Sequence, residues 1–230
     1  DGEYSFYFAT STEFEPKLYK FSVNNYDDLL DIDIQALIES DEISKFESDE
    51  RLVLICTHGT YDSCCGKYGV KIFNEIKDDS RISVWHTTHV GAHRFSANLV
   101  MLPEGIYYGR VNYNNIDELI SSHLNQEIYL DCFRGRTCYT MTSQVSDYFL
   151  RDKINKKGIY DIAWEFERDR YSYTSVEFHV ESESLTYSVN SMVLNNALDI
   201  PASCGDTKLK KIDQFYFYSL VPYTPKEKEA

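Results

Sequence analysis

Two short stretches constrain the fold and the chemistry of this chain more than any other feature. The first is the sequence CTHGTYDSCC at residues 56–65, and the second is WHTTHVGAHR at residues 85–94. Together they hold three of the six cysteines and four of the six histidines. Soft thiolate and imidazole ligands packed this densely indicate a metal centre.

The residues around Cys56 and Cys65 predict a loop that joins a strand to a helix. The apolar run RLVLIC at residues 51–56 has the length of a buried strand. Apolar residues after Gly66 recur close to the helical period, so we expect Cys65 just before a helix N-terminus, where backbone N–H groups favour a thiolate. A second strand at residues 81–86 leads to His89 and His93, on a loop that contains Gly91. The two strand ends, the helix and the loop can converge on one small cofactor.

These motifs, taken as a set, resemble the sucrase/ferredoxin-like family. The resemblance rests on CTHG at 56–59, the vicinal cysteines 64 and 65, HVGAHRF at 89–95 and PEGIYYGR at 103–110. Further matches are RGR at 134–136 and SCG at 203–205, so it covers roughly residues 50–220. The resemblance implies a thioredoxin-like ferredoxin domain.

In cluster-bearing relatives, a Cys-x8-Cys pair and a His-x3-His pair hold a [2Fe–2S] cluster. The matching positions are Cys56, Cys65, His89 and His93. The resemblance therefore implies a one-electron carrier. Because the members of each pair are close in sequence, we expect the two cysteines to bind one iron and the two histidines the other. An alternative from a different class is a binding module on the same fold, in which these four residues hold a structural Zn²⁺. An adaptor without metal is a third reading.

Several neighbouring residues compete with this ligand set. Cys64 competes with Cys65, and only the family spacing favours Cys65; Cys64 is otherwise a small core residue or a thiol that tunes the cluster. We expect His58 to lie beside the ligands and His86 to be a solvated strand end, although either can replace a ligand.

The sequence supports only general expectations for four further residues. We expect Cys132, Cys138 and Cys204 to be small buried hydrophobic residues. Arg94 is equally suited to donate hydrogen bonds near the cluster and to pair with a carboxylate.

The sequence gives little support to enzymes of other classes. It contains no Gly-x-Gly-x-x-Gly or Walker loop, no Gly-x-Ser-x-Gly elbow and no Cys-x-x-Cys redox centre. Glycoside hydrolysis needs two placed carboxylates, and among 37 Asp and Glu no pair stands out. We therefore expect an electron carrier rather than an enzyme in its own right.

Composition bounds the partners and the compartment. The net charge of −14 argues against a nucleic-acid groove and suits a carrier steered to a basic patch on a redox partner, for which a flavoprotein reductase is our expectation. No apolar run is long enough to span a bilayer, and no signal peptide opens the sequence, so we expect no membrane contact. Six unevenly spaced cysteines do not form a disulfide framework, which favours the cytoplasm.

The expected architecture is a mixed α/β chain in two parts. Residues 1–150 form the thioredoxin-like ferredoxin domain, a sheet flanked by helices that carries the cluster site. Residues 151–230 form an antiparallel β-rich segment packed on it, because hydrophobic and polar residues alternate there. The expected strands are residues 4–8, 18–23, 51–56, 81–86, 95–102, 106–111, 162–166, 176–180, 185–189 and 214–221. The turn at Pro103–Gly105 is expected to join 95–102 to 106–111 in a β-hairpin. Helices are expected over residues 27–46, after Gly66, after a cap at Asn115 and from a cap at Ser143 to about Asn155, and the tail from Pro225 is expected to fray.

Overall fold

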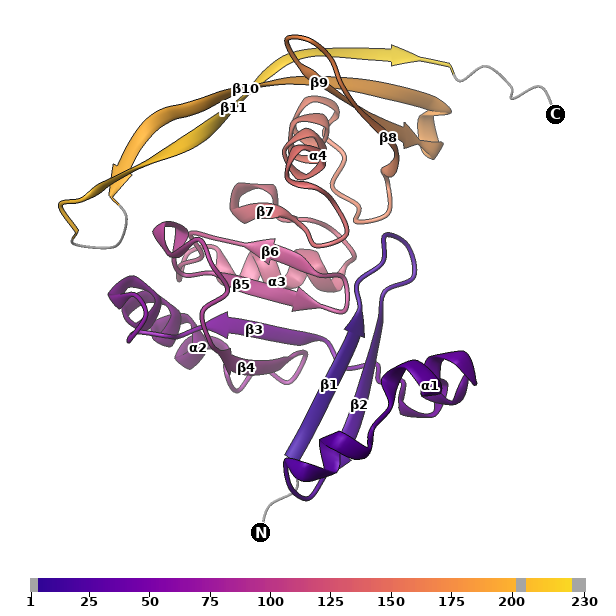
Figure 1. The fold of residues 1–230 in the computed structure, drawn as a ribbon, viewed down its shortest axis with the longest axis vertical. Helices are drawn as coiled ribbons and strands as arrows, with labels where there is room; N and C mark the ends of the chain where they lie inside the picture. Colours follow the sequence, from indigo (N-terminus) through magenta and orange to yellow (C-terminus); the bar gives the residue numbers. More distant parts are fainter. Residues whose placement is uncertain (1–3, 202–205, 225–230) are drawn as a thin grey trace.

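The computed structural model describes residues 4–201 and 206–224. Within these ranges it contains a two-stranded, a five-stranded and a four-stranded sheet, which follow one another along the chain (Figure 1). The predicted frayed tail from Pro225 and the motif around Cys204 lie outside the described residues. No helix in these ranges has both the length and the apolar character needed to cross a bilayer.

The N-terminal part is a β-hairpin followed by short helical turns. Strands β1 (Tyr4–Thr10) and β2 (Lys17–Val23) lie where two strands were predicted, and the structure pairs them antiparallel. The single helix predicted over residues 27–46 is wrong, because that segment consists of a 3-10 turn (Asp27–Asp31), α1 (Ile34–Glu39) and a second 3-10 turn (Glu42–Phe46). Asp33 accepts a hydrogen bond from the backbone N–H of Ala36 and starts α1, and Asp41 adopts a left-handed conformation that ends it. Aspartates favour such local bonds over a continuous helix.

The five-stranded sheet has the strand order β4-β3-β5-β6-β7. Its members are β3 (Leu52–Cys56), β4 (Ser83–Thr87), β5 (Leu99–Leu102), β6 (Ile106–Tyr108) and β7 (Phe133–Arg136). Strands β3 and β4 are parallel and are connected by the crossover helix α2 (Val70–Ile76). Strands β5 and β6 form the predicted antiparallel hairpin. The arrangement is the thioredoxin-like one, which confirms the predicted fold class. The sequence prediction missed β7, which is short and contains two arginines.

One face of this sheet carries the main hydrophobic core. Helix α3 (Ile116–Leu124) buries Ile116, Leu119 and Ile120 completely against the sheet residues. Asn115 precedes α3 as predicted, but its side chain accepts a hydrogen bond from the N–H of Asn112 instead of capping the helix. The predicted side-chain cap is therefore wrong, although the helix begins where it was expected.

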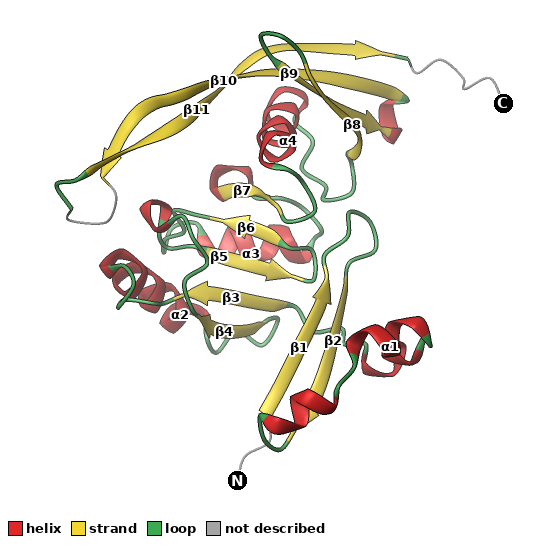
Figure 2. Ribbon diagram, in the orientation of Figure 1, coloured by secondary structure: helices red, strands yellow, loops and turns green. Residues whose placement is uncertain are grey.

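Helix α4 (Met141–Ile154) packs beneath the C-terminal sheet, as Figure 2 shows. Its cap is Thr140, which accepts a hydrogen bond from the N–H of Ser143 over 3.1 Å, so the expectation that Ser143 itself caps the helix is wrong. The sheet has the order β11-β10-β9-β8 and is antiparallel throughout, as the alternating pattern predicts. Its strands are β8 (Ala163–Asp169), β9 (Thr174–Val180), β10 (Leu185–Pro201) and β11 (Leu209–Tyr223). Leu150 of α4 meets Val176 and Phe178 in a second core.

The loop of the N-terminal hairpin joins the two larger sheets. The carboxylate of Glu13 accepts hydrogen bonds from the Tyr139 hydroxyl over 2.5 Å and from the backbone N–H of Trp164 over 2.6 Å. The backbone carbonyl of Glu13 accepts another from the buried guanidinium of Arg136. The tip of the β1–β2 hairpin therefore reaches the start of the C-terminal sheet.

Candidate metal centre

Cys56 and Cys65 come together because a buried strand ends beside the start of a helical segment. Cys56 is the last residue of β3, and both cysteines are fully buried. The carboxylate of Asp62 accepts a hydrogen bond from the N–H of Cys64 over 2.8 Å and so caps the helical segment. Ser63 and Cys64 are already helical, and Cys65 opens a π-helical turn (Cys65–Gly69) that continues into α2. The sequence predicted Cys65 just before the helix, whereas the structure places it in the first turn.

A glycine allows this helical segment to approach the strand end. A Cβ atom on Gly69 would lie 2.0 Å from the carbonyl oxygen of Cys56, which no side chain can tolerate. Any residue other than glycine would push the helix away from β3 and separate the two sulfurs.

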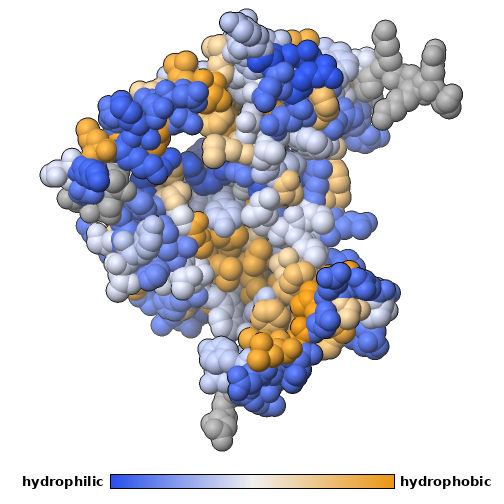
Figure 3. Space-filling view, in the orientation of Figure 1, coloured by the Kyte–Doolittle hydropathy of each residue, from blue (hydrophilic) through white to orange (hydrophobic). Residues whose placement is uncertain are grey.

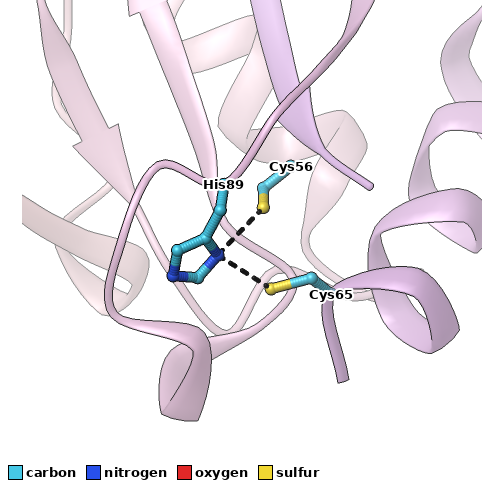
Figure 4. Close-up of side chains that lie close together, drawn as sticks. All are labelled: Cys56, Cys65 and His89. Atoms are coloured by element: carbon cyan, nitrogen blue, oxygen red, sulfur yellow. Dashed lines mark hydrogen bonds between the residues drawn. The ribbon is translucent and has the colours of Figure 1, made fainter. Parts of the chain in front are cut away.

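His89 completes a three-residue group with the two cysteines. Its Nδ1 atom lies 3.8 Å from the Cys56 sulfur and 3.7 Å from the Cys65 sulfur (Figure 4). The three potential ligand atoms lie within 4.8 Å of one another. The backbone N–H of His89 donates a hydrogen bond to Nδ1 of His58 over 3.3 Å, which helps to hold the loop after β4 in place. Soft sulfur and imidazole donors at this spacing can hold a thiophilic metal.

His93 lies next to this group but not in it. Its ring centroid is 5.7 Å from that of His89, and its Nε2 atom lies 3.8 Å from a carboxylate oxygen of the buried Asp62. The structure therefore brings together three of the four predicted ligands. The fourth, His93, lies beside the ring of His89.

The competing residues occupy different environments. His58 lies beside His89, as expected. His86 is exposed, stacks on Phe73 with ring centroids 3.5 Å apart and contacts the Thr57 hydroxyl over 3.1 Å. Cys64 is half-buried and disulfide-bonded, so it is not a free thiol here.

The remaining cysteines are only partly as expected. Cys132 is 3% exposed, in agreement with the prediction, whereas Cys138 is exposed because it lies in the turn after β7. Cys204 lies outside the described residues.

Electrostatics favour a bound cation at the three-residue group. Burial raises the pKa of the Cys65 thiol to about 12, and the neighbouring Cys56 and Asp62 add to the effect. Burial lowers the pKa of His89, assisted by the positive charge that His93 and His58 can carry. His89 is therefore a neutral imidazole with a free lone pair at neutral pH. Two buried thiols can ionise together only when a cation compensates their charge.

Two residues of the site were not assigned their roles from the sequence. The ring of Tyr61 stacks on that of His89. Asp62 caps the helical segment and approaches His93. An aspartate directly before a helical start is a capping signal, so this part of its role was readable from the sequence.

Comparisons with known proteins place these observations in context. The "Altered inheritance of mitochondria protein 32" of Meyerozyma guilliermondii is 30% identical over 105 residues, which cover 41% of this chain and 37% of that protein. The chain therefore matches little more than a third of the length of this relative.

Solved structures were also compared. The wild-type thioredoxin-like [2Fe–2S] ferredoxin of Aquifex aeolicus is 20% identical, with a TM-score of 0.34 over 39% of this chain and 100% of that one. A cysteine-to-serine variant of that ferredoxin is 20% identical, with a TM-score of 0.33 over 37% of this chain and 99% of the other.

The family comparison covers more of the chain. The model described as "Sucrase/ferredoxin-like" matches residues 6–135, which is more than half of the 230 residues. This range includes the three segments that form the site, namely the strand end at Cys56, the helical turn at Cys65 and the loop at His89. The chain belongs to the sucrase/ferredoxin-like family.

Proposed function

We propose that this protein transfers single electrons by means of a [2Fe–2S] cluster held by Cys56, Cys65, His89 and His93. The observation that carries the proposal is the convergence of two buried sulfurs and one imidazole nitrogen within 4.8 Å. When bound, such a cluster takes up and releases one electron without a change in the covalent structure of the protein.

The residues fit this cofactor in type and in environment. Cys56 and Cys65 would supply two thiolates at the junction of a strand end and a helical first turn, where backbone N–H groups offset negative charge. His89 would supply a neutral imidazole, and His93 lies close enough on the same loop to supply the second. The buried carboxylate of Asp62 near His93 can accept the proton of the nitrogen that does not bind metal. The pairing of the cysteines on one iron and the histidines on the other is part of the proposal.

Metal and sulfide analysis tests the proposal directly. Protein purified without oxygen should contain about two irons and two acid-labile sulfides per chain, and it should be red-brown with visible charge-transfer absorption. Stoichiometric zinc in a colourless protein, with no iron recovered by anaerobic reconstitution, would contradict it.

The second candidate is a binding module stabilised by Zn²⁺. The observation in its favour is that three ligand atoms within 4.8 Å of one another suit a single tetrahedral ion, with His93 as the fourth ligand. In that case chelation should unfold the region around α2, whereas a redox titration should show no one-electron couple.

Partners and compartment follow from charge and cysteine use. We propose a flavoprotein reductase as the electron donor, steered by the net charge of −14 toward a basic patch, and neither nucleic acid nor membrane as a partner. The cytoplasm is the proposed compartment, since most of the described cysteines are free thiols. The name of the yeast relative refers to mitochondria. Cell fractionation should therefore compare the cytoplasm with mitochondria.

A further inference from the structure

Three arginines from three separate sequence motifs surround one aromatic ring. The guanidinium carbons of Arg94, Arg110 and Arg134 lie 4.4, 5.2 and 3.5 Å from the ring centroid of Phe95. Arg94 follows the candidate ligand His93, Arg110 follows β6, and Arg134 is in β7. The arginines of the motifs HRF, YGR and RGR, none of which is a proposed cluster ligand, thus meet at one place.

This concentration of positive charge is not neutralised by the described part of the chain. None of the three guanidinium groups forms an ion pair with a described Asp or Glu, although Arg51, Arg81 and Arg151 all do. Burial lowers the pKa of Arg134 to about 10, and the neighbouring Arg94 and Arg110 add to the effect. In a chain with 37 acidic residues, three unneutralised arginines at one ring are a specific arrangement.

Two of the three arginines, Arg110 and Arg134, border a cavity with aromatic walls. The cavity has a volume of about 350 Å³ and lies between the end of β6, the start of β7, helix α4 and strand β11. Phe95, Phe133, Tyr148, Phe149 and Phe215 contribute apolar surface, and Arg110 and Arg134 contribute charge. The long β10–β11 hairpin arches over this side of the molecule, and Figure 3 shows the surface hollowed beneath it. Cavities of this size hold small ligands.

We propose that this cavity binds a small organic phosphate that carries an aromatic ring, such as a nucleotide. A phosphate group offers several acceptor oxygens, and each arginine presents a planar fork of N–H donors that matches them. The aromatic walls suit a planar ring, which can stack on a phenylalanine or tyrosine. The carboxylate of Asp131 also borders the cavity, yet it pairs with none of the three arginines, so the net charge of the border stays positive.

The phosphate and the aromatic ring of the proposed ligand would contact different parts of the cavity. A phosphate without a ring would use the arginines and leave the aromatic walls uncovered. A nucleoside without phosphate would use the walls and leave the repulsion among the arginines unrelieved. A nucleotide that satisfies both parts is expected to bind more tightly than either.

Calorimetric titration of the full chain as purified, at about 0.1 M salt, tests this site with ADP, pyrophosphate and adenosine as probes. ADP should bind, pyrophosphate should bind at least about tenfold more weakly, and adenosine more weakly still. Arg110→Gln and Arg134→Gln should each weaken ADP binding about tenfold or more, because each removes a charge-assisted hydrogen bond. Arg168→Gln is the matched control, since Arg168 also lies over a phenylalanine ring, that of Phe166 at 4.7 Å, but does not line the cavity.

A thermal unfolding curve of each free variant separates loss of binding from loss of folding. Arg134→Gln should unfold at the same or a higher temperature than the unmodified protein, because the substitution relieves like-charge repulsion. The proposal is overturned if the unmodified protein does not bind ADP, if adenosine or pyrophosphate binds as tightly as ADP, or if the folded Arg134→Gln variant binds ADP as well as Arg168→Gln does. None of these results depends on whether the protein holds iron, so the test is independent of the proposed electron transfer.

Discussion

The ring of Tyr61 stacks on the ring of His89, with centroids 3.9 Å apart and an angle of 21° between their planes. Tyr61 is 62% exposed, so it lies between solvent and the candidate ligand. A contact of this kind contributes about 0.5–1.5 kcal/mol.

The first prediction follows from this stacking. In the metal-loaded protein, Tyr61→Ala should speed the loss of metal to a chelator roughly two- to tenfold, because His89 loses its cover and its orientation. Tyr113→Ala is the control, since Tyr113 is 54% exposed and is not a stacking partner of His89. Equal rates of metal loss in the two variants would show that the stacking has no protective role.

The second prediction distinguishes the vicinal cysteines. Cys56→Ser and Cys65→Ser should each lose most of the bound metal, because both thiols are buried beside His89 and serine is a poor ligand for a soft metal. Cys64→Ser should keep it, since Cys64 is disulfide-bonded outside the three-residue group. Metal analysis of the three variants shows which of the two vicinal cysteines binds the metal. A Cys64→Ser protein without metal, beside a metal-loaded Cys65→Ser protein, would reverse the assignment.

The third prediction concerns the reduction potential. Two thiolates and two neutral imidazoles give a cluster two fewer negative charges than four thiolates do, and so raise its potential. A double variant with His89→Cys and His93→Cys that retains its cluster should have a potential lower by at least about 100 mV in film voltammetry. The control His86→Cys adds a nearby thiol at an exposed histidine and should leave the potential unchanged. A double variant with the original potential would argue against histidine ligands.

The fourth prediction concerns stability at alkaline pH. Burial raises the pKa of the Cys132 thiol to about 11, whereas an unfolded thiol titrates near pH 8.5. The unfolded chain therefore releases this proton first, and the contribution of the neutral thiol to stability is complete below about pH 8.5 and declines as pH rises toward 11.

Denaturant unfolding at several pH values measures this effect. Between pH 8.5 and 10.5 the unmodified protein should lose on the order of 1–2 kcal/mol more free energy of unfolding than Cys132→Ala, in which this group cannot titrate. Parallel curves for the two proteins would rule out a contribution from Cys132.

The fifth prediction concerns the hairpin loop that bridges the sheets. Glu13→Ala should lower the free energy of unfolding by about 1–3 kcal/mol, because it leaves the hydroxyl of Tyr139, a residue only 8% exposed, without its acceptor. Glu15→Ala, at an exposed position in the same loop, should change it by less than about 0.5 kcal/mol. If both variants unfold alike, the loop is not a structural bridge.

The sequence predicted those elements whose stability is local or periodic. The apolar run before Cys56 identifies β3, the turn at Pro103–Gly105 identifies the β5–β6 hairpin, and alternation identifies the C-terminal sheet. These signals are readable because one buried face imposes its period on the residues that form it. The family motifs also gave Cys56, Cys65 and His89 as candidates, and the structure places these three together, while their role as ligands stays a proposal.

Other features were decided by tertiary contacts alone. The acidic segment after β2 divides into short turns because its aspartates bond locally, and β7 pairs with β6 although its own sequence has no strand period. The approach of Gly69 to the carbonyl of Cys56 sets the spacing of the two sulfurs, and no residue pattern encodes that distance.

The arginine cluster also depends partly on the sequence and partly on the tertiary structure. The sequence determined that Arg94, Arg110 and Arg134 each belong to a recognisable motif, but they are separated by 16 and 24 positions along the chain. Only the fold brings the turn at Arg94, the segment after β6 and strand β7 together, so that the three charges meet at the ring of Phe95. Which of these distant residues become neighbours depends on the topology of the fold. The periodicity of a sequence shows which face of a helix or strand a residue occupies, but it does not show which other part of the chain packs against that face.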